Sequence, residues 1–169
     1  ERVSKTIDLG TGTLGADISA THRIPAISDD GALVATHEPK GDSVVWSAAT
    51  GKAVRHFTRP TKTFYGRAFD PTGKLFVSCD TFGVTRVWDA KRAVVVKEFT
   101  TPNRRSGWGL AISRDGKSLV MGSDASLVHL VALPSGRVKH ALKGLKGQGE
   151  CRAAFSPNGK WVAVGNEQS

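Results

Sequence analysis

The chain has 169 residues, of which 39% are hydrophobic, so it is long enough for a domain with an apolar core. Its 19 glycines show no collagen-like period and indicate many turns, while no apolar run is long enough for a transmembrane helix, so we predict no membrane insertion. The formal net charge of +9 predicts attraction to anionic partners, either nucleic acid or acidic protein surfaces.

The first predicted elements are a strand at residues 1–9 and a connection at residues 10–15. The pattern of ERVSKTIDL predicts a strand that ends a four-stranded unit. The glycines of GTGTLG are loosely similar to a phosphate-binding loop, but no helix is predicted after them whose dipole would meet a phosphate. We therefore interpret residues 10–15 as a flexible connection.

One turn then occurs four times, as ISDDGA at residues 27–32, FDPTGK at 69–74, ISRDGK at 112–117 and FSPNGK at 155–160. Its glycines are 42, 43 and 43 residues apart, at Gly31, Gly73, Gly116 and Gly159. In the second copy Asp70 can bond its own backbone, Pro71 fixes φ near about −65° and Gly73 accepts a left-handed conformation. Each copy predicts a hairpin between two strands.

Short alternating strands recur at the same period, and no helix is predicted. In the second repeat the strands are expected at residues 74–79 (KLFVSC), 84–88 (VTRVW) and 94–99 (VVVKEF). The first three turn glycines are followed after 15 residues by Trp46, Trp88 and Val131, and after five more by Gly51, Ala93 and Gly136. These landmarks indicate antiparallel units of four strands and about 42 residues, which must stack on neighbours to bury both faces.

The stretch AFDPTGKLFVSCDTFGVTRVWD, residues 68–89, resembles a blade of the WD-repeat family of β-propellers, and VVWSAATGK and ALPSGRV are weaker copies. The resemblance covers essentially the whole chain. It implies an all-β propeller of four-stranded antiparallel blades, with about four blades present and the last incomplete. The repeats would be residues 1–22 (partial), 23–65, 66–107, 108–150 and 151–169 (partial).

The sequence departs from the family pattern in two features. Many members rigidify each blade with a Gly-His pair and a turn aspartate, which bond with a Ser or Thr and the Trp. This chain has no Gly-His dipeptide, and Phe82 stands where the aspartate is usual. We therefore expect its blades to depend more on packing than on that network.

Three interpretations of the chain ends stay open. The predicted strands number 15, one short of four complete blades. The chain is a segment of a longer propeller, or its N-terminal strand joins the last blade, or a second copy completes the ring. We favour the first interpretation, because a ring without its closing units exposes hydrophobic faces and sheet edges.

The residue types that usually carry catalysis form no recognisable motif. The sequence contains no dinucleotide-binding glycine motif, Walker-type phosphate loop, nucleophile elbow or zinc-protease motif. The five histidines lack ligand spacing, and the turn aspartates already have a structural role. Cys79 and Cys151 show no CxxC spacing, so we expect two free thiols in a reducing, cytoplasmic compartment. We predict a protein that is not an enzyme and needs no metal or other cofactor.

The remaining candidates lie mainly in the connections between repeats, at residues 58–65, 100–108 and 143–150. In a propeller these connections share one face with the turns between second and third strands, and partners commonly bind there. Basic residues with interleaved aromatics can hold an acidic peptide, or stack bases and contact phosphates. The predicted partner-binding residues are Lys62, Tyr65, Phe82, Arg104, Arg105, Trp108, Lys143 and Lys146.

The resemblance implies a non-catalytic protein–protein interaction scaffold that presents these loops to a protein or peptide partner, with an acidic one favoured by the charge. The alternative is a propeller that binds nucleic acid or another polyanion through its basic loops. A third possibility is an accessory domain of a larger enzyme.

Overall fold

A computed structural model describes residues 3–7, 14–19, 22–37, 42–58, 64–80, 82–100, 109–122, 127–143 and 151–166. These residues form strands and turns. Among them there is no helix long and apolar enough to cross a membrane. The chain divides into two compact units, Glu1–Thr63 and Phe64–Ser169.

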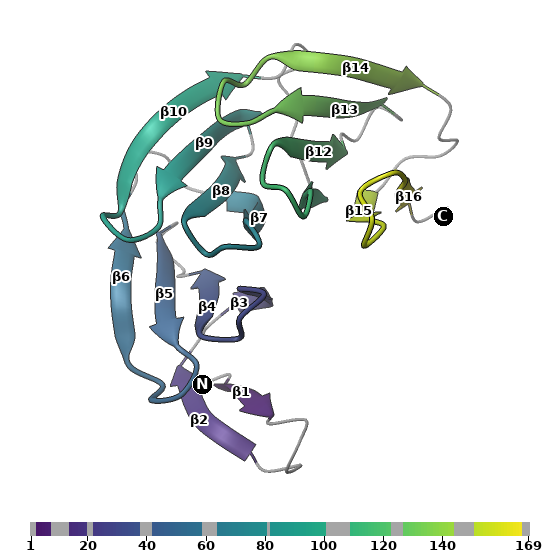
Figure 1. Ribbon diagram of the computed structural model, residues 1–169. Coiled ribbons are helices and arrows are strands. Elements are labelled where there is room, and N and C mark those ends of the chain that lie inside the picture. Colours follow the sequence, from purple (N-terminus) through teal and green to yellow (C-terminus); the bar gives the residue numbers. More distant parts are fainter. Residues whose placement is uncertain are drawn as a thin grey trace. The chain divides into compact units, whose positions relative to one another are not determined.

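The first unit contains one two-stranded and one four-stranded antiparallel sheet (Figure 1). The strands are β1 (Val3–Ile7) and β2 (Leu14–Ser19), then β3 (His22–Ile27), β4 (Leu33–His37), β5 (Ser43–Ser47) and β6 (Ala53–Phe57), each paired with its neighbours in sequence. Ile18, Val34 and Ala48 form a small buried cluster, and Trp46 packs against it. This cluster joins the two sheets, because Ile18 belongs to β2 and Val34 to β4.

The prediction for the N-terminal residues is wrong in two respects. Residues 1–9 were expected to supply the fourth strand of a unit, but β1 pairs with β2 in a hairpin, and β2 precedes the next sheet. Leu14 and Gly15, assigned to a flexible connection, lie in β2. The described residues therefore contain 16 strands, one more than the sequence predicted.

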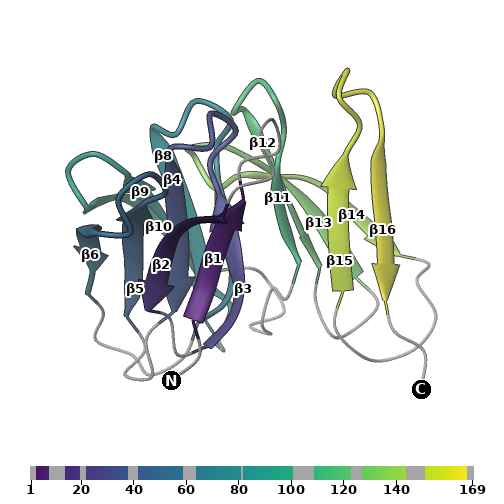
Figure 2. The same ribbon diagram turned by 90° about the horizontal axis from the view of Figure 1, so that it is seen from below.

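The second unit contains three antiparallel sheets in chain order (Figures 1 and 2). The first sheet is β7 (Phe64–Phe69), β8 (Leu75–Asp80), β9 (Val84–Asp89) and β10 (Val94–Thr100); the second is β11 (Leu110–Ile112), β12 (Ser118–Gly122), β13 (Leu127–Ala132) and β14 (Val138–Lys143); the third is β15 (Cys151–Phe155) and β16 (Val162–Asn166). The opening strand of each sheet contacts the opening strand of the next. The predicted all-β chain of repeated four-stranded units is confirmed, with three such units and two two-stranded sheets.

The repeated turn has the same geometry in all four copies. In the second copy the Asp70 N–H donates to the Leu75 carbonyl at 3.0 Å, and the Gly73 N–H donates to the Asp70 carbonyl at 2.9 Å. The φ of Gly73 is 66°, so the predicted left-handed glycine is confirmed. The Thr72 hydroxyl donates to the Asp70 carboxylate at 2.5 Å, so here the first turn residue accepts. In the other copies the first residue donates and the residue two positions later accepts. There a serine opens the turn and bonds an Asp or Asn two residues later, at Ser28, Ser113 and Ser156.

The third and fourth strands of each four-stranded sheet pair with one shift in register. In the sheet of β7–β10, Val95 pairs with Trp88 and Lys97 pairs with Val87, so Val96 is an extra residue on β10. The other two sheets have the same bulge 42 residues earlier, at Val54, and 43 residues later, at Lys139. The bulge is therefore a feature of the repeat and not of one sheet.

One buried hydrogen bond of the repeat is replaced by apolar residues in the sheet of β11–β14. The Trp88 Nε1–H donates to the Ser78 hydroxyl at 2.9 Å, and the tryptophan of the first unit's four-stranded sheet makes the same bond to a threonine at 2.7 Å. The residues 43 positions after Trp88 and Ser78 are Val131 and Met121, both buried. Because donor and acceptor are lost together, the replacement leaves no unpaired polar atom at positions 121 and 131.

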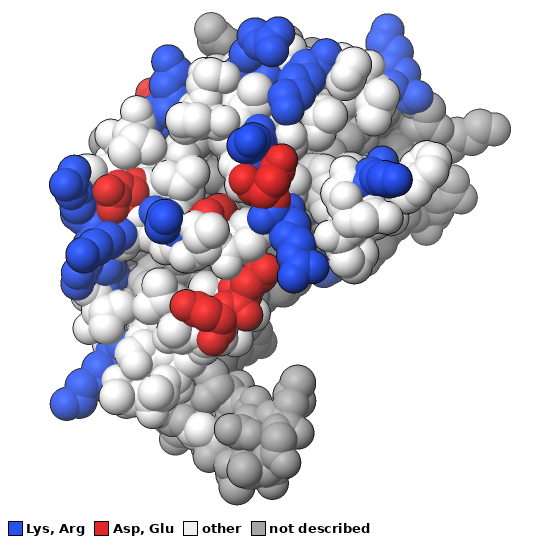
Figure 3. Space-filling view, in the orientation of Figure 1, with Lys and Arg blue, Asp and Glu red and all other residues white. Residues whose placement is uncertain are grey.

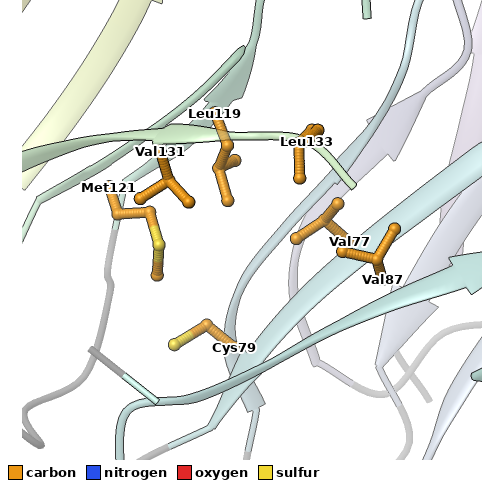
Figure 4. Close-up of a cluster of buried hydrophobic side chains, with 7 residues drawn as sticks. All are labelled: Val77, Cys79, Val87, Leu119, Met121, Val131 and Leu133. Atoms are coloured by element: carbon orange, nitrogen blue, oxygen red, sulfur yellow. The ribbon is translucent and has the colours of Figure 1, made fainter. Parts of the chain in front are cut away.

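A buried cluster of seven side chains joins the two four-stranded sheets of the second unit (Figure 4). Its members are Val77, Cys79, Val87, Leu119, Met121, Val131 and Leu133. Both cysteines of the chain, Cys79 and Cys151, are buried free thiols, as expected from their spacing. Within each unit, consecutive sheets thus bury apolar side chains against each other, which agrees with the predicted need of the repeats to stack.

Candidate functional site

Two of the predicted partner-binding residues, Phe82 and Lys143, have described side chains. The backbone of Tyr65 lies in β7, and its side chain is outside the described part. The other predicted residues lie outside the described residues, namely Lys62, Arg104, Arg105, Trp108 and Lys146. The roles of these six residues stay predictions.

The strand register places Phe82 and Lys143 at the same kind of sheet end. Thr100, the last residue of β10, pairs with Val84, the first of β9, and Phe64 pairs with Asp80. The turn that contains Phe82 therefore lies at the end of its sheet where β7 begins and β10 ends. Lys143 ends β14 opposite Leu127, the first residue of β13.

The ring of Phe82 is presented to solvent by a turn with a fixed backbone. Its relative exposure is 64%, the second largest among the large hydrophobic side chains that the structure describes. The Asp80 carboxylate oxygen Oδ1 accepts the N–H groups of Phe82 and Val84, both at 2.9 Å. The Gly83 N–H donates to the Asp80 carbonyl at 3.0 Å, and the φ of Gly83 is 76°. Asp80 thus holds this turn at three points.

A buried ion network fixes Asp80 in turn. Arg86 of β9 places Nη1 at 3.5 Å from Asp80 Oδ2 and Nε at 2.5 Å from Glu98 Oε2 of β10. The side chains of Asp80 and Arg86 are 1% and 10% exposed, and that of Glu98 is 52% exposed. The buried guanidinium therefore has a carboxylate on each side, which is the condition under which a buried charge is tolerated.

Polar bonds are present in this sheet, although we expected its stability to depend more on packing than on such a network. Phe82 does occupy the usual aspartate position, but Asp80, two residues earlier, bonds the turn from the strand end. The bond between Trp88 and Ser78 is also present. The sequence signal was an aspartate three residues before a glycine, a spacing at which the carboxylate reaches the turn's N–H groups.

Burial shifts the pKa of three other groups in the second unit. Desolvation lowers the pKa of Arg67 in β7 to about 10. His129 stands 43 residues after Arg86, at 2% exposure, and burial lowers the pKa of its imidazole. Burial raises the pKa of the Cys151 thiol, so at neutral pH it is protonated and a poor nucleophile.

The described residues offer no cluster for metal binding, since no group of three or more His, Cys, Asp or Glu among them is placed to hold an ion. No model of a known protein family matches the chain, and a search of curated proteins gave no match. The candidate site is defined by its own geometry: the exposed ring of Phe82 on the turn that Asp80 holds.

Proposed function

We propose that the chain is a non-catalytic protein-interaction module, similar to WD-repeat β-propellers, that binds a protein or peptide partner at the loop ends of its sheets. The observation that carries this proposal is the exposed ring of Phe82 on a turn held by Asp80. An aromatic side chain on a pre-organised backbone loses little conformational entropy on binding, and such residues are frequent hot spots at interfaces.

The propeller arrangement is supported by three regularities of the chain. The turn glycines recur at 42 or 43 residues, the four-stranded sheets share one topology, and consecutive sheets of the second unit bury apolar faces against each other. A repeated unit with these properties is typical of blades arranged about an axis. In that arrangement the loop ends of successive sheets would form one continuous binding face.

The charge of the chain supports an acidic partner. Lys143 is exposed at the loop end of β14, and the predicted residues Lys62, Arg104, Arg105 and Lys146 belong to the connections that follow the fourth strands. The formal net charge of +9 accelerates association with anionic surfaces. Aromatic contact would supply most of the affinity, and the basic residues would supply selectivity.

The test is selection of binders from a displayed peptide library, followed by affinity measurements with the chosen synthetic peptides. We expect Phe82→Ala to weaken these peptides by about tenfold or more, which corresponds to about 1.4 kcal/mol, without changing stability. Trp161→Ala is the matched control, because Trp161 is 74% exposed and lies at the opposite sheet end. Peptides that bind equally well to the Phe82→Ala and wild-type proteins would refute the role of this turn.

The salt dependence of binding and the class of ligand bound distinguish the polyanion alternative from the proposed peptide binding. Binding to an oligonucleotide or to heparin through several phosphates or sulfates would weaken steeply between about 50 and 200 mM salt. A peptide contact centred on an aromatic ring would weaken far less. Retention of oligonucleotides that persists in Phe82→Ala, together with no selected peptide, would favour the polyanion function over the proposed one.

A further inference from the structure

Four turns of the second unit lie at the sheet end opposite to Phe82 (Figure 2). Each turn connects antiparallel neighbours, either the first strand with the second or the third with the fourth, and such turns share one end of a sheet. They are residues 70–74 and 90–93 in the sheet of β7–β10, and residues 113–117 and 133–137 in the sheet of β11–β14. We call the surface that these turns form the turn face.

Hydrogen bonds and close packing connect the turns with each other. The Ala90 N–H donates to the Lys74 carbonyl at 2.8 Å. The same bond recurs 43 residues later, at 2.9 Å, to the Lys117 carbonyl. The turns of the two sheets are adjacent as well, because a Cβ at Gly116 would lie 3.6 Å from Asp70 Oδ2. The turn face is therefore continuous from one sheet to the next.

Cations predominate on the turn face. Lysine or arginine side chains are exposed in each of the four turns, and one more is exposed near the start of β14. They are Lys74, Lys91, Arg92, Arg114, Lys117, Arg137 and Lys139. The face seen in Figure 3 shows lysine and arginine side chains with few carboxylates between them. The equivalent turn of the first unit carries Asp29 and Asp30 and has alanine in place of the lysine, so this charge is not a general feature of the repeat.

The carboxylates at this sheet end are engaged within their own turns. They belong to Asp70, Asp89 and Asp115. The Asp70 carboxylate is buried and accepts the Leu75 N–H at 2.6 Å. Asp115 accepts the Ser113 hydroxyl at 2.5 Å and the Lys117 N–H at 3.0 Å, and these bonds lower its pKa. Three carboxylates against seven cations leave the turn face with an excess of positive charge.

Two properties favour nucleic acid as the partner. Lys74 and Lys117 occupy the same position in consecutive repeats, so the scaffold presents repeated cations, and the phosphates of a nucleic-acid backbone are repeated anions. In these four turns, all of which the structure describes, no large hydrophobic side chain is exposed. A protein partner would find no apolar anchor there, whereas contacts to phosphates need only cations and hydrogen-bond donors.

We propose that the turn face binds the phosphate backbone of nucleic acid, with Lys74 and Lys117 as central contacts and with Arg114 and Arg137 as further ones. The contacts are made to phosphates and not to base edges, so binding is independent of base sequence. This surface goes beyond the peptide site proposed at Phe82 and depends on none of its residues. It also differs from the polyanion alternative, which places the contacts in the basic connections between repeats.

The test uses a fluorescein-labelled DNA duplex of about 20 base pairs, measured by anisotropy with the full chain at about 50 to 200 mM salt. We expect saturable binding, and the logarithm of the affinity should fall linearly with the logarithm of the salt concentration, by about 0.9 for each phosphate neutralised. Lys74→Gln combined with Lys117→Gln should weaken binding about tenfold at about 100 mM salt and make this slope shallower by about 2. Lys74→Arg combined with Lys117→Arg keeps both charges and should retain the affinity within about threefold.

The matched control is Arg55→Gln combined with Lys97→Gln. These two residues also occupy one position in consecutive repeats, 42 residues apart, and both are exposed on outer strands. The control removes the same charge away from the turns, so it should change the affinity less than about threefold and the slope by less than about 0.5. Equal effects of the two pairs, or no binding at about 0.1 mM protein and about 50 mM salt, would overturn the proposal.

Further variants and ligands discriminate the other contacts and partners. Loss of duplex binding in Arg104→Gln combined with Arg105→Gln, with binding retained in Lys74→Gln combined with Lys117→Gln, would locate the contacts in the connections between repeats and overturn the proposal. Polyglutamate that binds as tightly as the duplex, with the same loss in the lysine variant, would identify an acidic protein as the partner, with the same consequence. Phe82→Ala should leave the affinity for the duplex unchanged, so the duplex test and the peptide test at the loop end can fail independently.

Discussion

The most informative single substitution is Asp80→Ala, because Asp80 connects the buried network to the turn that presents Phe82. The change removes the acceptor of two backbone N–H groups, each at 2.9 Å, and one carboxylate beside the buried guanidinium of Arg86. A hydrogen bond to a charged group contributes about 1.5–3 kcal/mol, and removal of one partner of a buried pair costs about 3–5 kcal/mol. The two effects share one carboxylate and do not add, so we expect a loss of about 3–5 kcal/mol.

Asp80→Asn separates the two contributions. The amide oxygen still accepts the N–H groups of Phe82 and Val84, but the negative charge beside Arg86 is lost. We expect a smaller loss of about 1–3 kcal/mol, since Glu98 remains on the other side of the guanidinium. Glu98→Gln is expected to cost about 1 kcal/mol or less, because its side chain is 52% exposed.

The assay is urea unfolding followed by tryptophan fluorescence, for which Trp88 is a reporter in the same sheet. Peptide binding of the folded Asp80→Asn protein gives a second readout of the turn. A loss below about 1 kcal/mol in Asp80→Ala, or equal losses in Asp80→Ala and Asp80→Asn, would refute the argument that this carboxylate holds the turn.

Three further predictions concern backbone strain, packing and pH. Ala93 has a φ of 56°, whereas the equivalent residues are Gly51 and Gly136, so Ala93→Gly should raise the urea midpoint and stabilise the protein by about 0.5–1 kcal/mol. Gly159 has a φ of 68° with open space around it, so Gly159→Ala should destabilise the protein by a similar amount. Stability changes of the same sign in both variants would contradict the reasoning. Gly122→Ala should destabilise the protein by about 1–3 kcal/mol, because the added Cβ would overlap the side chain of Cys151. Thermal unfolding measures this loss, and an unchanged melting temperature would contradict the packing of β12 on β15. Burial lowers the pKa of His129 in the folded protein, so the unfolded chain binds a proton first as the pH falls below about 6.5. The free energy of unfolding should therefore decrease from that pH toward the pKa of the folded state, and His129→Gln should flatten this decrease in urea titrations at about pH 5 to 7.5. An identical slope in the variant would exclude His129 as the cause.

The elements that follow from local chemistry could be predicted from the sequence. The four turns were identified because a glycine at fixed spacing, preceded by Ser or Asp, has few other uses, and Gly73 and its equivalents indeed have positive φ. β2 could not be identified with the same rule. Its sequence LGADIS contains glycine and alanine, which have low strand propensity, and among its described side chains Ile18 is the one that is buried.

The candidate site could be predicted from the sequence only in part. The exposure of Phe82 followed from its place beside a turn glycine. The ion network could not be predicted from the sequence. If β10 had no bulge, the pairing of Val95 with Trp88 would continue and place Lys97 opposite Arg86. The bulge at Val96 instead brings Glu98 opposite Arg86.

The bulge of the outer strands also restricts where the repeat can change in length. Val96 itself is unpaired, so its deletion would leave Lys97 opposite Val87 and Glu98 opposite Arg86, whereas loss of a paired residue from β9 would shift the register of that strand. The three complete repeats have the same number of residues from the turn glycine to the outer strand. The first repeat period is one residue shorter than the others because Phe57 and Gly73 are 16 positions apart, whereas the corresponding residues of the later repeats are 17 positions apart. Insertions engineered into the connections between repeats should therefore be accepted, whereas a single residue added to or removed from the buried strands β8 and β9 would shift their register and should destabilise that sheet.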